Sequence, residues 1–321
     1  MSGGHRFCAD RNKVKAGGTK CRMRCKKRKT LMASMRDIKR RRESVSSTQQ
    51  ITKAMKLVST VKLQRAKGRA IKSKYYFRAM YNTVTDLLSD SANIDTPYVK
   101  QSECDRKAVL VITSNRGLAG GYNSNIVKLI TNGDFDKDKT DIYIIGRKGR
   151  ELLERKGYYI RKDYSELAEG FEYADAIKVC NKLLKEFDEK KIGEIYLAYT
   201  NFKNTVSHEP TLLKLLPIIP GEIYGSEEED DPNDKLLLMN FEIPDEEALK
   251  YIVPKYLTSL IHGALIEAVA SENGARMQAM DNATNNAEEM IDKLTLQYNR
   301  ARQGSITQEL TEIIAGAEAI S

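Results

Sequence analysis

The chain has 321 residues, of which 41% are hydrophobic and 30% are charged. Its apolar runs, such as Ala108 to Ile112, are too short to cross a bilayer, so the sequence predicts no membrane span. The formal net charge of +9 is concentrated in residues 1–31, which hold 11 Lys or Arg and one Asp. The rest of the chain is close to neutral, so a nucleic-acid-binding function would depend on this leader alone.

The basic leader, residues 1–31, lacks the apolar core of a secretory signal. His5, Cys8, Cys21 and Cys25 are residue types that bind zinc, but their spacing is not diagnostic of a zinc site. A zinc or nucleic-acid module and a transit peptide are two alternatives. The favoured interpretation is a disordered segment or an upstream extension, because the recognisable protein begins at Met32 or Met35.

A long helix is predicted from Met35 to about Ser91. The segment contains no Pro, and its single Gly is Gly68. Helix-forming residues dominate, and apolar residues such as Ile51, Met55 and Val58 recur at helical spacing. A helix of about 80 Å needs a partner along its length, because propensity alone does not stabilise it.

The middle of the chain, from about Arg106 to Phe241, alternates short β-rich runs with helical stretches. Strands are predicted at KAVLVITS, DIYIIG and EIYLAYTNF, and helices at GRKGRELLERKG and Asp175 to Lys191. This alternation is typical of a mostly parallel, Rossmann-like sheet.

One loop in this region, Asn115 to Gly121, follows a strand and precedes a helix, which is where phosphate loops lie. It lacks both the Gly-Lys-Ser/Thr of a P-loop and the spaced glycines of the dinucleotide fingerprint. A tight turn with close backbone packing is therefore favoured over a nucleotide site.

Other candidates for chemistry in residues 32–321 are few. His208 and His262 lie in no catalytic or metal-binding motif, and His262 is predicted to be a packing or surface residue. The acidic run Glu227 to Asp231 is most simply a solvated loop. Cys104 and Cys180 form no disulfide framework, which favours a reducing compartment.

A second long helix is predicted after Pro244, where acidic residues follow a helix-starting Pro. Pro254 is expected to separate a short first piece from the continuation. Steps of three and four residues beyond it are the pattern of a left-handed coiled coil. The residues predicted for this seam are Met280, Ala283, Ala287, Met290, Leu294, Tyr298 and Ala301, and the same alternation continues through Ile306, Leu310, Ile313, Ala317 and Ile320.

Three segments carry a resemblance to a known family. They are MRDIKRRRESVSSTQQITKAMKLVSTVKLQRAK (Met35–Lys67), ITSNRGLAGGYNSNI (Ile112–Ile126) and ASENGARMQAMDNATNNAEEMIDKLTLQYNRARQGSITQELTEIIAGAEAI (Ala270–Ile320). Within the last of these, ITQELTEIIAGAEA (Ile306–Ala319) fits the signature pattern of the family throughout. All three resemble gamma subunits of F-type ATP synthases of the bacterial type. Ala119 stands where many members have Cys, and the regulatory cysteine insertion of chloroplast members is not seen.

The resemblance implies an α/β fold in which the N- and C-terminal helices form a long antiparallel left-handed coiled coil beside a Rossmann-like middle domain. The expected parts are a leader (1–31), an N-terminal coiled-coil helix (32–105), the α/β domain (106–243) and a C-terminal coiled-coil helix (244–321).

The implied function is that of a rotor shaft without a catalytic site, cofactor or metal, which couples proton or sodium flow to ATP synthesis or hydrolysis. The implied partners are the α and β subunits around the coil, the epsilon subunit and the membrane c-ring, with catalysis on the β subunits. The implied location is the cytoplasmic face of the plasma membrane, with the mitochondrial inner membrane as the lesser alternative.

The residues expected to contact the ring and couple the two processes match family positions and lie on coil surfaces outside the seam. They are Arg36, Arg40, Lys53, Met55, Arg276, Gln303, Thr307 and Glu309. The main alternative function is a Rossmann-like nucleotide-binding enzyme that uses the loop at Gly117 to Gly121. It leaves both terminal helices unexplained.

Overall fold

The computed structural model describes residues 35–90, 98–99, 104–168, 170–204, 207–218 and 245–320. The leader, with its candidate zinc ligands His5, Cys8, Cys21 and Cys25, lies outside the described residues, as does the acidic run Glu227 to Asp231. The elements are α1 (Met35–Asp90), β1 (Lys107–Ile112), α2 (Tyr122–Thr131), β2 (Thr140–Ile145), α3 (Arg147–Arg155), β3 (Ile160–Asp163), a 3-10 turn (Ser165–Ala168), α4 (Tyr173–Asp188), β4 (Glu194–Phe202), β5 (His208–Leu216) and α5 (Asp245–Glu318).

The sheet has the order β3-β2-β1-β4-β5. Strands β1 to β4 are parallel and β5 is antiparallel to β4. The mostly parallel α/β sheet predicted from the alternation of strands and helices is thus confirmed. The edge strands β3 and β5 were not predicted, because only half-buried alternation marks them in the sequence.

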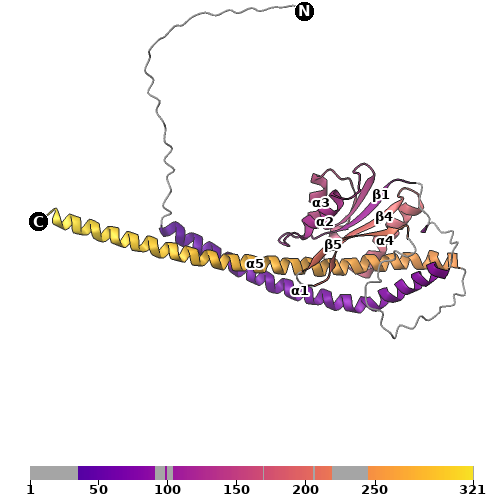
Figure 1. The fold of residues 1–321 in the computed structure, drawn as a ribbon, viewed down its shortest axis with the longest axis horizontal. Helices are drawn as coiled ribbons and strands as arrows, with labels where there is room; N and C mark the ends of the chain where they lie inside the picture. Colours follow the sequence, from indigo (N-terminus) through magenta and orange to yellow (C-terminus); the bar gives the residue numbers. More distant parts are fainter. Residues whose placement is uncertain are drawn as a thin grey trace, which may run out of the picture.

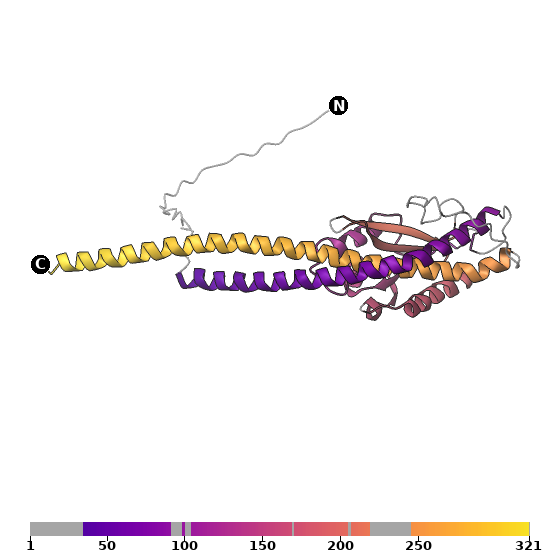
Figure 2. The same cartoon turned by 90° about the horizontal axis from the view of Figure 1, so that it is seen from below.

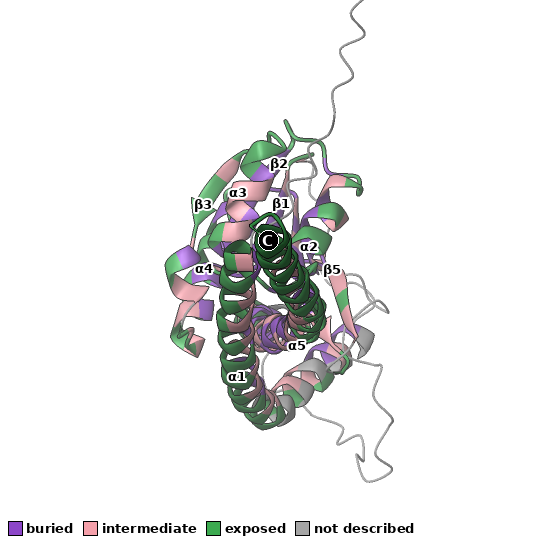
Figure 3. Cartoon of the chain, turned by 90° about the vertical axis from the view of Figure 1, so that its left-hand side faces the viewer, coloured by how far each residue is buried: buried purple, intermediate pink, exposed green. Residues whose placement is uncertain are grey.

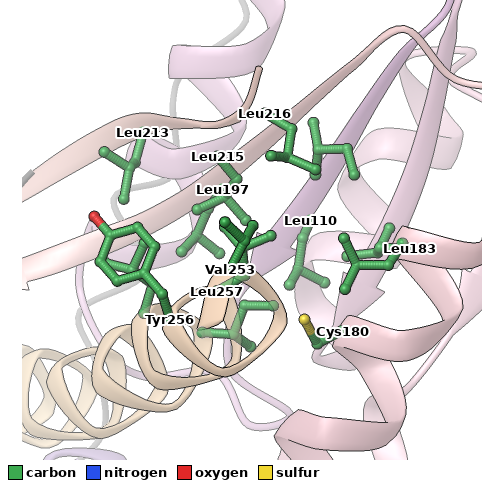
Figure 4. Close-up of a cluster of buried hydrophobic side chains, with 14 of the residues drawn as sticks. Leu110, Cys180, Leu183, Leu197, Leu213, Leu215, Leu216, Val253, Tyr256 and Leu257 are labelled. Carbon is green, nitrogen blue, oxygen red and sulfur yellow. The ribbon is translucent and has the colours of Figure 1, made fainter. Parts of the chain in front are cut away.

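The sheet lies between two layers of helices, as Figure 1 shows. Because side chains alternate across a strand, Val109 and Val111 of β1 face the layer with α2 and α3. Ala108, Leu110 and Ile112 face the other layer, which contains α4, α5 and the end of α1. Figure 4 shows this second interface, where Leu110 and Leu197 meet Val253 and Leu257 of α5. One long terminal helix therefore forms part of the core of the domain.

α1 and α5 run antiparallel, side by side, in both Figure 1 and Figure 2. Their register is fixed by contacts along the pair. The guanidinium of Arg42 lies 5.6 Å from the centre of the Tyr298 ring, and the Lys56 ammonium lies 2.6 Å from Asp281. Farther along, Leu63 and Ala66 pack against Ala270. α1 and the part of α5 beside it together form the coil.

The coil has a seven-residue repeat on both helices. On α1 the positions 38, 52, 59 and 66 are buried, and on α5 the positions 273, 280, 287 and 294 are buried. A strict repeat of seven produces a left-handed supercoil, as the sequence predicted. The small residues Thr52, Ser59 and Ala66 occupy the α1 seam, so the helices can approach closely.

The predicted seam differs from the structure at Met290 and beyond it, where the residues expected to continue it are exposed, namely Ile306, Leu310, Ile313, Ala317 and Ile320. Met290, expected in the seam, is 51% exposed. Ile51 and Val58, whose spacing was the apolar signal on α1, are also more than half exposed, because the seam lies one residue later at Thr52 and Ser59. The apolar spacing on α1 thus marks a face that points away from α5.

Pro254 does not separate two helices. α5 runs unbroken through it for 74 residues. The surrounding packing offsets the lost backbone hydrogen bond, since Val253 and Leu257 are buried in the core and the Thr258 hydroxyl donates a 2.7 Å hydrogen bond to the Pro254 carbonyl. In the described part of the chain, no helix is long and apolar enough to cross a membrane.

Candidate functional site

The outer face of α1 carries an exposed apolar stripe. Ile51, Leu57, Val58 and Val61 are between 52% and 63% exposed. Ile51 and Val58 lie beside the seam, about 100° around α1 from Thr52 and Ser59, and Leu57 and Val61 lie farther round, since each residue advances by about 100° around a helix. Large exposed aliphatic side chains gathered on one face indicate a surface that another protein covers.

The end of α5 extends beyond α1. Because Arg42 lies level with Tyr298, Met35, where α1 begins, lies level with about residue 305. Residues 304–318 of α5 therefore have no described helix beside them (Figure 2) and are here called the tip. All tip residues except Ser305 are exposed, as Figure 3 shows in green. The tip also carries large aliphatic side chains, namely Ile306, Leu310, Ile313 and Ile314, which are 44% to 68% exposed.

A helix of 15 residues without packing partners is marginal in water. Both its exposure and its apolar side chains therefore indicate a surface for partner proteins, since the described part of this chain does not cover it.

Basic side chains surround the coil just below the tip. They are exposed or half-buried in the described structure. Two acidic residues, Asp37 and Glu43, lie near them on α1. This basic collar consists of Arg36, Lys39, Arg40, Arg41 and Arg42 on α1 and Arg300 and Arg302 on α5. Cations at the N-terminus of a helix are opposed by its dipole, so the net charge of the collar works against the α1 helix itself. Its charge suits an acidic partner surface.

The residues predicted to couple the coil to a ring lie in three places. Arg36, Arg40 and Lys53 are exposed on α1, and Met55 is half-buried beside the seam. Gln303, Thr307 and Glu309 are exposed at the start of the tip. Within this group, Thr307 donates a 2.9 Å hydrogen bond to the Gln303 carbonyl, and Ser305 donates a 3.4 Å bond to Glu309.

Arg276 differs from the others because it is 8% exposed. Its guanidinium donates to Glu272 at 2.7 Å and to the carbonyl oxygens of Arg116 and Gly117 at 3.4 Å each. The side chain expected on an open coil surface is thus at the junction of the coil with the α/β domain. The sequence contained no signal for this contact, since the two segments are 160 residues apart.

The loop that contacts Arg276 joins β1 to α2, as predicted. It is braced internally, because the Ser114 hydroxyl donates to the Arg116 carbonyl at 2.6 Å and the Ser114 amide donates to Asn123 at 3.0 Å. Gly120 has φ +57°, and a Cβ built on it would lie 3.9 Å from the Cβ of Ala279 on α5. The loop therefore lies directly against the coil.

Tyr122, at the start of α2, adds a buried contact from the same loop to α5. Its hydroxyl donates a 3.3 Å hydrogen bond to the Ala268 carbonyl. Burial, followed by the nearby Glu272 charge, raises the pKa of Tyr122 well above its usual value. The tyrosine therefore remains a neutral hydrogen-bond donor at any physiological pH.

The end of the β4–β5 hairpin contacts the coil at the same level. Ser271 of α5 donates a 3.1 Å hydrogen bond to the Thr200 carbonyl, and the Phe202 ring packs against the Leu63, Ala66 and Ala270 cluster. A Cβ on Gly274 would lie 2.7 Å from Cε1 of His208, so only Gly allows this approach. A glycine inside a helical pattern was the one sequence signal for this contact.

Together, the loop at residues 114–122 and the hairpin residues Thr200, Phe202 and His208 are here called the clamp. They hold α5 between residues 268 and 279.

A buried charge cluster stabilises the opposite end of the sheet. Glu186 is 3% exposed and accepts hydrogen bonds from the Tyr143 hydroxyl and from Arg161, the latter at 2.8 Å, while the Lys182 ammonium lies 3.0 Å away. Burial alone would raise the pKa of Glu186, but the bonds from Tyr143, Lys182 and Arg161 hold it below its usual value. Glu186 is therefore an ionised structural group.

His262 packs among aromatic rings, as predicted for a packing residue. Its ring centre lies 5.2 Å from that of Tyr173 and 6.2 Å from that of Phe171. Burial, together with the charge of Arg69, lowers its pKa.

Comparison with known proteins is consistent with this architecture. The model of the ATP synthase family described as "ATP synthase" matches residues 34–320. The chain is 61% identical over 291 residues to the ATP synthase gamma chain of Lachnoclostridium phytofermentans, covering 90% of this chain and 100% of that one. It is 39% identical over 299 residues to the sodium ion specific ATP synthase gamma chain of Acetobacterium woodii, covering 90% of this chain and 99% of that one.

The fold also matches solved structures. A chain of the Euglena gracilis mitochondrial ATP synthase OSCP/F1/c-ring structure aligns with a TM-score of 0.62 at 19% identity, covering 89% of this chain and 94% of that one. A chain of the Tetrahymena thermophila central stalk and c-ring structure aligns with a TM-score of 0.55 at 22% identity, covering 73% and 99%. The chain therefore belongs to the family of ATP synthase gamma chains.

Proposed function

We propose that this chain is the rotating central shaft of an F-type ATP synthase and that catalysis takes place on the β subunits around it. The observation that carries the proposal is the tip, a helix that the described residues of this chain leave exposed and that carries four large aliphatic side chains. A ring of α and β subunits around the coil and tip supplies the missing packing. The exposed stripe of Ile51, Leu57, Val58 and Val61 faces the same ring.

The shaft acts by differential contact. α1 and α5 present different side chains on their outer faces, and α5 alone reaches the tip, so the coil is asymmetric. A ring of near-threefold symmetry meets a different face of the coil at each β subunit. Each β subunit is therefore biased toward a different conformation and nucleotide affinity as the shaft turns.

The basic collar contributes to this contact by charge. Arg36, Arg40 and Arg302 lie on the outside of the coil, where acidic side chains of the β subunits pass them in turn. Lys53 and Met55 contact the ring about four helical turns beyond Arg40, and Gln303, Thr307 and Glu309 contact it at the base of the tip. Contacts between exposed charges are individually weak, so they guide the rotation without holding the shaft in one orientation.

The domain end of the molecule attaches to the rotor in the membrane. The epsilon subunit and the c-ring bind the α/β domain and the lower coil, at the end away from the tip. Ion flow through the c-ring, of protons or sodium ions, turns the chain. The complex lies on the cytoplasmic face of the plasma membrane, and the chain reaches that membrane through its partners.

Reconstitution tests the proposal. Residues 32–321 are mixed with α and β subunits of the same source, and complex formation and ATP hydrolysis are recorded for the full chain and for a chain ending at Gln303. The full chain is expected to form a stable complex that hydrolyses ATP, and the shortened chain to form a weaker complex with several-fold lower turnover. Failure to assemble, together with nucleotide turnover by the isolated chain, would instead support the Rossmann-like enzyme.

A matched control separates loss of tip contacts from loss of helix. Ile313→Asn with Ile314→Asn removes two exposed apolar side chains, while Glu312→Gln changes an exposed polar residue in the same turn. Only the isoleucine variant is expected to weaken the complex. Equal effects of the two changes would count against an apolar bearing at the tip.

A further inference from the structure

One stretch of α1 beside the α/β domain is loosely packed. Ala66 and Val84 are buried, but none of the described α1 side chains between them is. This stretch, residues 67–83, is here called the span. Phe77 and Met80 of the span pack against the core and are partly buried. A segment with few buried contacts opens at a lower free energy than the elements around it. The span is therefore released from the molecule more easily than the parts of α1 on either side of it.

A chain of rings joins the span to the two helices beneath it. Tyr76 of the span meets Tyr173 of α4 edge-on, with ring centres 6.3 Å apart. Tyr173 in turn meets the imidazole of His262 on α5, with ring centres 5.2 Å apart. The Phe171 ring lies near the same imidazole, at 6.2 Å. Contacts at these distances and angles are favourable for aromatic rings. His262 thus lies at the junction of α1, α4 and α5.

The surroundings of His262 disfavour its charged form. Burial, followed by the charge of Arg69 on the span, lowers its pKa. A proton on the imidazole places a second positive charge near Arg69 in a half-buried site, where water screens it less than in solution. Two other basic side chains of the span, Lys74 and Arg78, lie outside the described structure. Because the folded-state pKa is below the unfolded value of about 6.5, the stabilisation by His262 is present above about pH 6.5. It is lost as the pH falls through the folded-state value.

The other titratable groups described at this junction supply no unpaired negative charge to the imidazole. Burial, followed by the side-chain hydrogen bond with Tyr76, raises the pKa of Tyr173, so Tyr173 stays neutral. Asp175, two residues farther along α4, pairs with Lys178 at 3.0 Å. The span and the imidazole are therefore held together by packing of neutral rings, which depends on the imidazole staying neutral too.

We propose that His262 is an acid-operated latch, which holds the span against α4 and α5 while the imidazole is neutral and releases the span when the imidazole takes up a proton. Release moves Arg69 away from the new charge and lets water reach the imidazole. The coil nearer the tip stays paired over the same pH range, since neither residues 35–66 nor residues 279–318 contain a histidine. The latch is a property of the chain itself and does not rest on the proposed function.

Hydrogen–deuterium exchange of the full chain, near pH 7.5 and near pH 5.5, tests the latch. The rates are corrected for the intrinsic pH dependence of amide exchange, and peptides from the span are compared with peptides from residues 38–59. The span is expected to lose up to about tenfold of its protection near pH 5.5, because an imidazole with a pKa of about 6.5 is there about ten times more often protonated than neutral. The peptides from residues 38–59 are expected to change by less than about twofold.

Two variants identify the group that responds. His262→Phe keeps a ring beside Phe171 and Tyr173 but takes up no proton, so its span is expected to exchange at the same corrected rate at both pH values, within about twofold. Arg69→Gln keeps the histidine and removes the neighbouring charge, so its span is expected to respond to acid less than that of the unmodified chain. This second variant keeps the test decisive if the phenylalanine disturbs the packing.

Three results would each overturn the latch. An equal acid response in the unmodified chain and in both variants would assign the response to other groups. A span that is unchanged or better protected near pH 5.5 would show that Phe171 and Tyr173 stabilise the charged imidazole by cation–π contact. An equal loss over the span and residues 38–59 would show general unfolding. Glu186 does not produce the expected result, because its stabilisation is lost only below about pH 4.3. The proposed function is tested separately, by assembly with α and β subunits.

Discussion

Thr52 of α1 and Thr284 of α5 share a hydrogen bond of 2.8 Å between their hydroxyl oxygens, although 232 residues separate them in the chain. Each hydroxyl is also within bonding distance of a carbonyl on its own helix, that of Gln49 at 3.0 Å and that of Met280 at 2.7 Å. The pair places a polar, directional contact in the middle of the seam. Such a contact favours one register of the two helices over others that apolar packing alone would allow.

Replacing this pair tests its role in the register. Thr52→Val and Thr284→Val are each expected to lower the free energy of unfolding by about 1 kcal/mol, since each removes one partner of a half-buried hydrogen bond. The double variant is expected to lose less than the sum, because the partners act on the same bond. Urea unfolding of the isolated chain measures all three values. Additive losses would show that the two hydroxyls act independently.

The Lys56–Asp281 ion pair, one turn away, is expected to contribute less. Its side chains are 39% and 44% exposed, so water screens the pair. Asp281→Asn should lower the free energy of unfolding by about 0.5 kcal/mol at low salt, and the difference should vanish near 1 M salt, where the Debye length is about 3 Å. Unfolding at two salt concentrations checks this. A loss that persists at high salt would assign the residue a packing role.

Glu186 makes the stability of the domain depend on pH. Because its pKa is lowered in the folded state, its stabilisation is present above the unfolded-state pKa of about 4.3 and is lost as the pH falls through the folded-state value. Glu186→Gln is expected to lower the free energy of unfolding by about 2 kcal/mol at pH 7, because it removes the charge that pairs with Arg161 and Lys182. The loss stays this small because both cations remain partly solvated. The difference from the unmodified chain should shrink below about pH 4. A difference independent of pH would exclude the carboxylate as its source.

Two glycines should respond to Ala in opposite directions. Gly146 has φ +114°, and a Cβ there would lie 2.2 Å from the Thr113 carbonyl oxygen, so Gly146→Ala should lower the free energy of unfolding by about 3 kcal/mol or more. Gly263 lies inside α5 with nothing within 4 Å of an added Cβ, so Gly263→Ala should raise it by up to about 1 kcal/mol. Thermal unfolding of the two variants side by side checks the signs. A destabilising Gly263→Ala would show that this helix position needs glycine for another reason.

The long helices and the parallel sheet could be predicted because local sequence determines them. The run without Pro from Met35 gives α1, and the β-rich segment EIYLAYTNF coincides with β4. The seam of α1 could not be found in the same way. An outer face that a partner covers is as apolar as a seam, so Ile51 and Val58 stood out while the true seam positions Thr52 and Ser59 are polar.

Two further features depend on tertiary contacts that no local pattern records. Pro254 should end a helix by its own chemistry, but the core packing on both sides of it keeps α5 continuous. Arg276 was expected on an open surface because charged residues on long helices usually lie there. Its burial depends on a loop 160 residues earlier in the chain, and only the fold brings the two together.

The pairing of the first helix with the last also has a consequence for biosynthesis. Lys56 leaves the ribosome 225 residues before its partner Asp281, a delay of about 10–45 s at about 5–20 residues per second. During that time α1 exposes both its seam and its outer apolar stripe. The core of the domain also still lacks α5, which packs with α4 on one face of the sheet. The coil therefore forms only after the whole α/β domain has been synthesised, so α1 waits for its partner throughout that time.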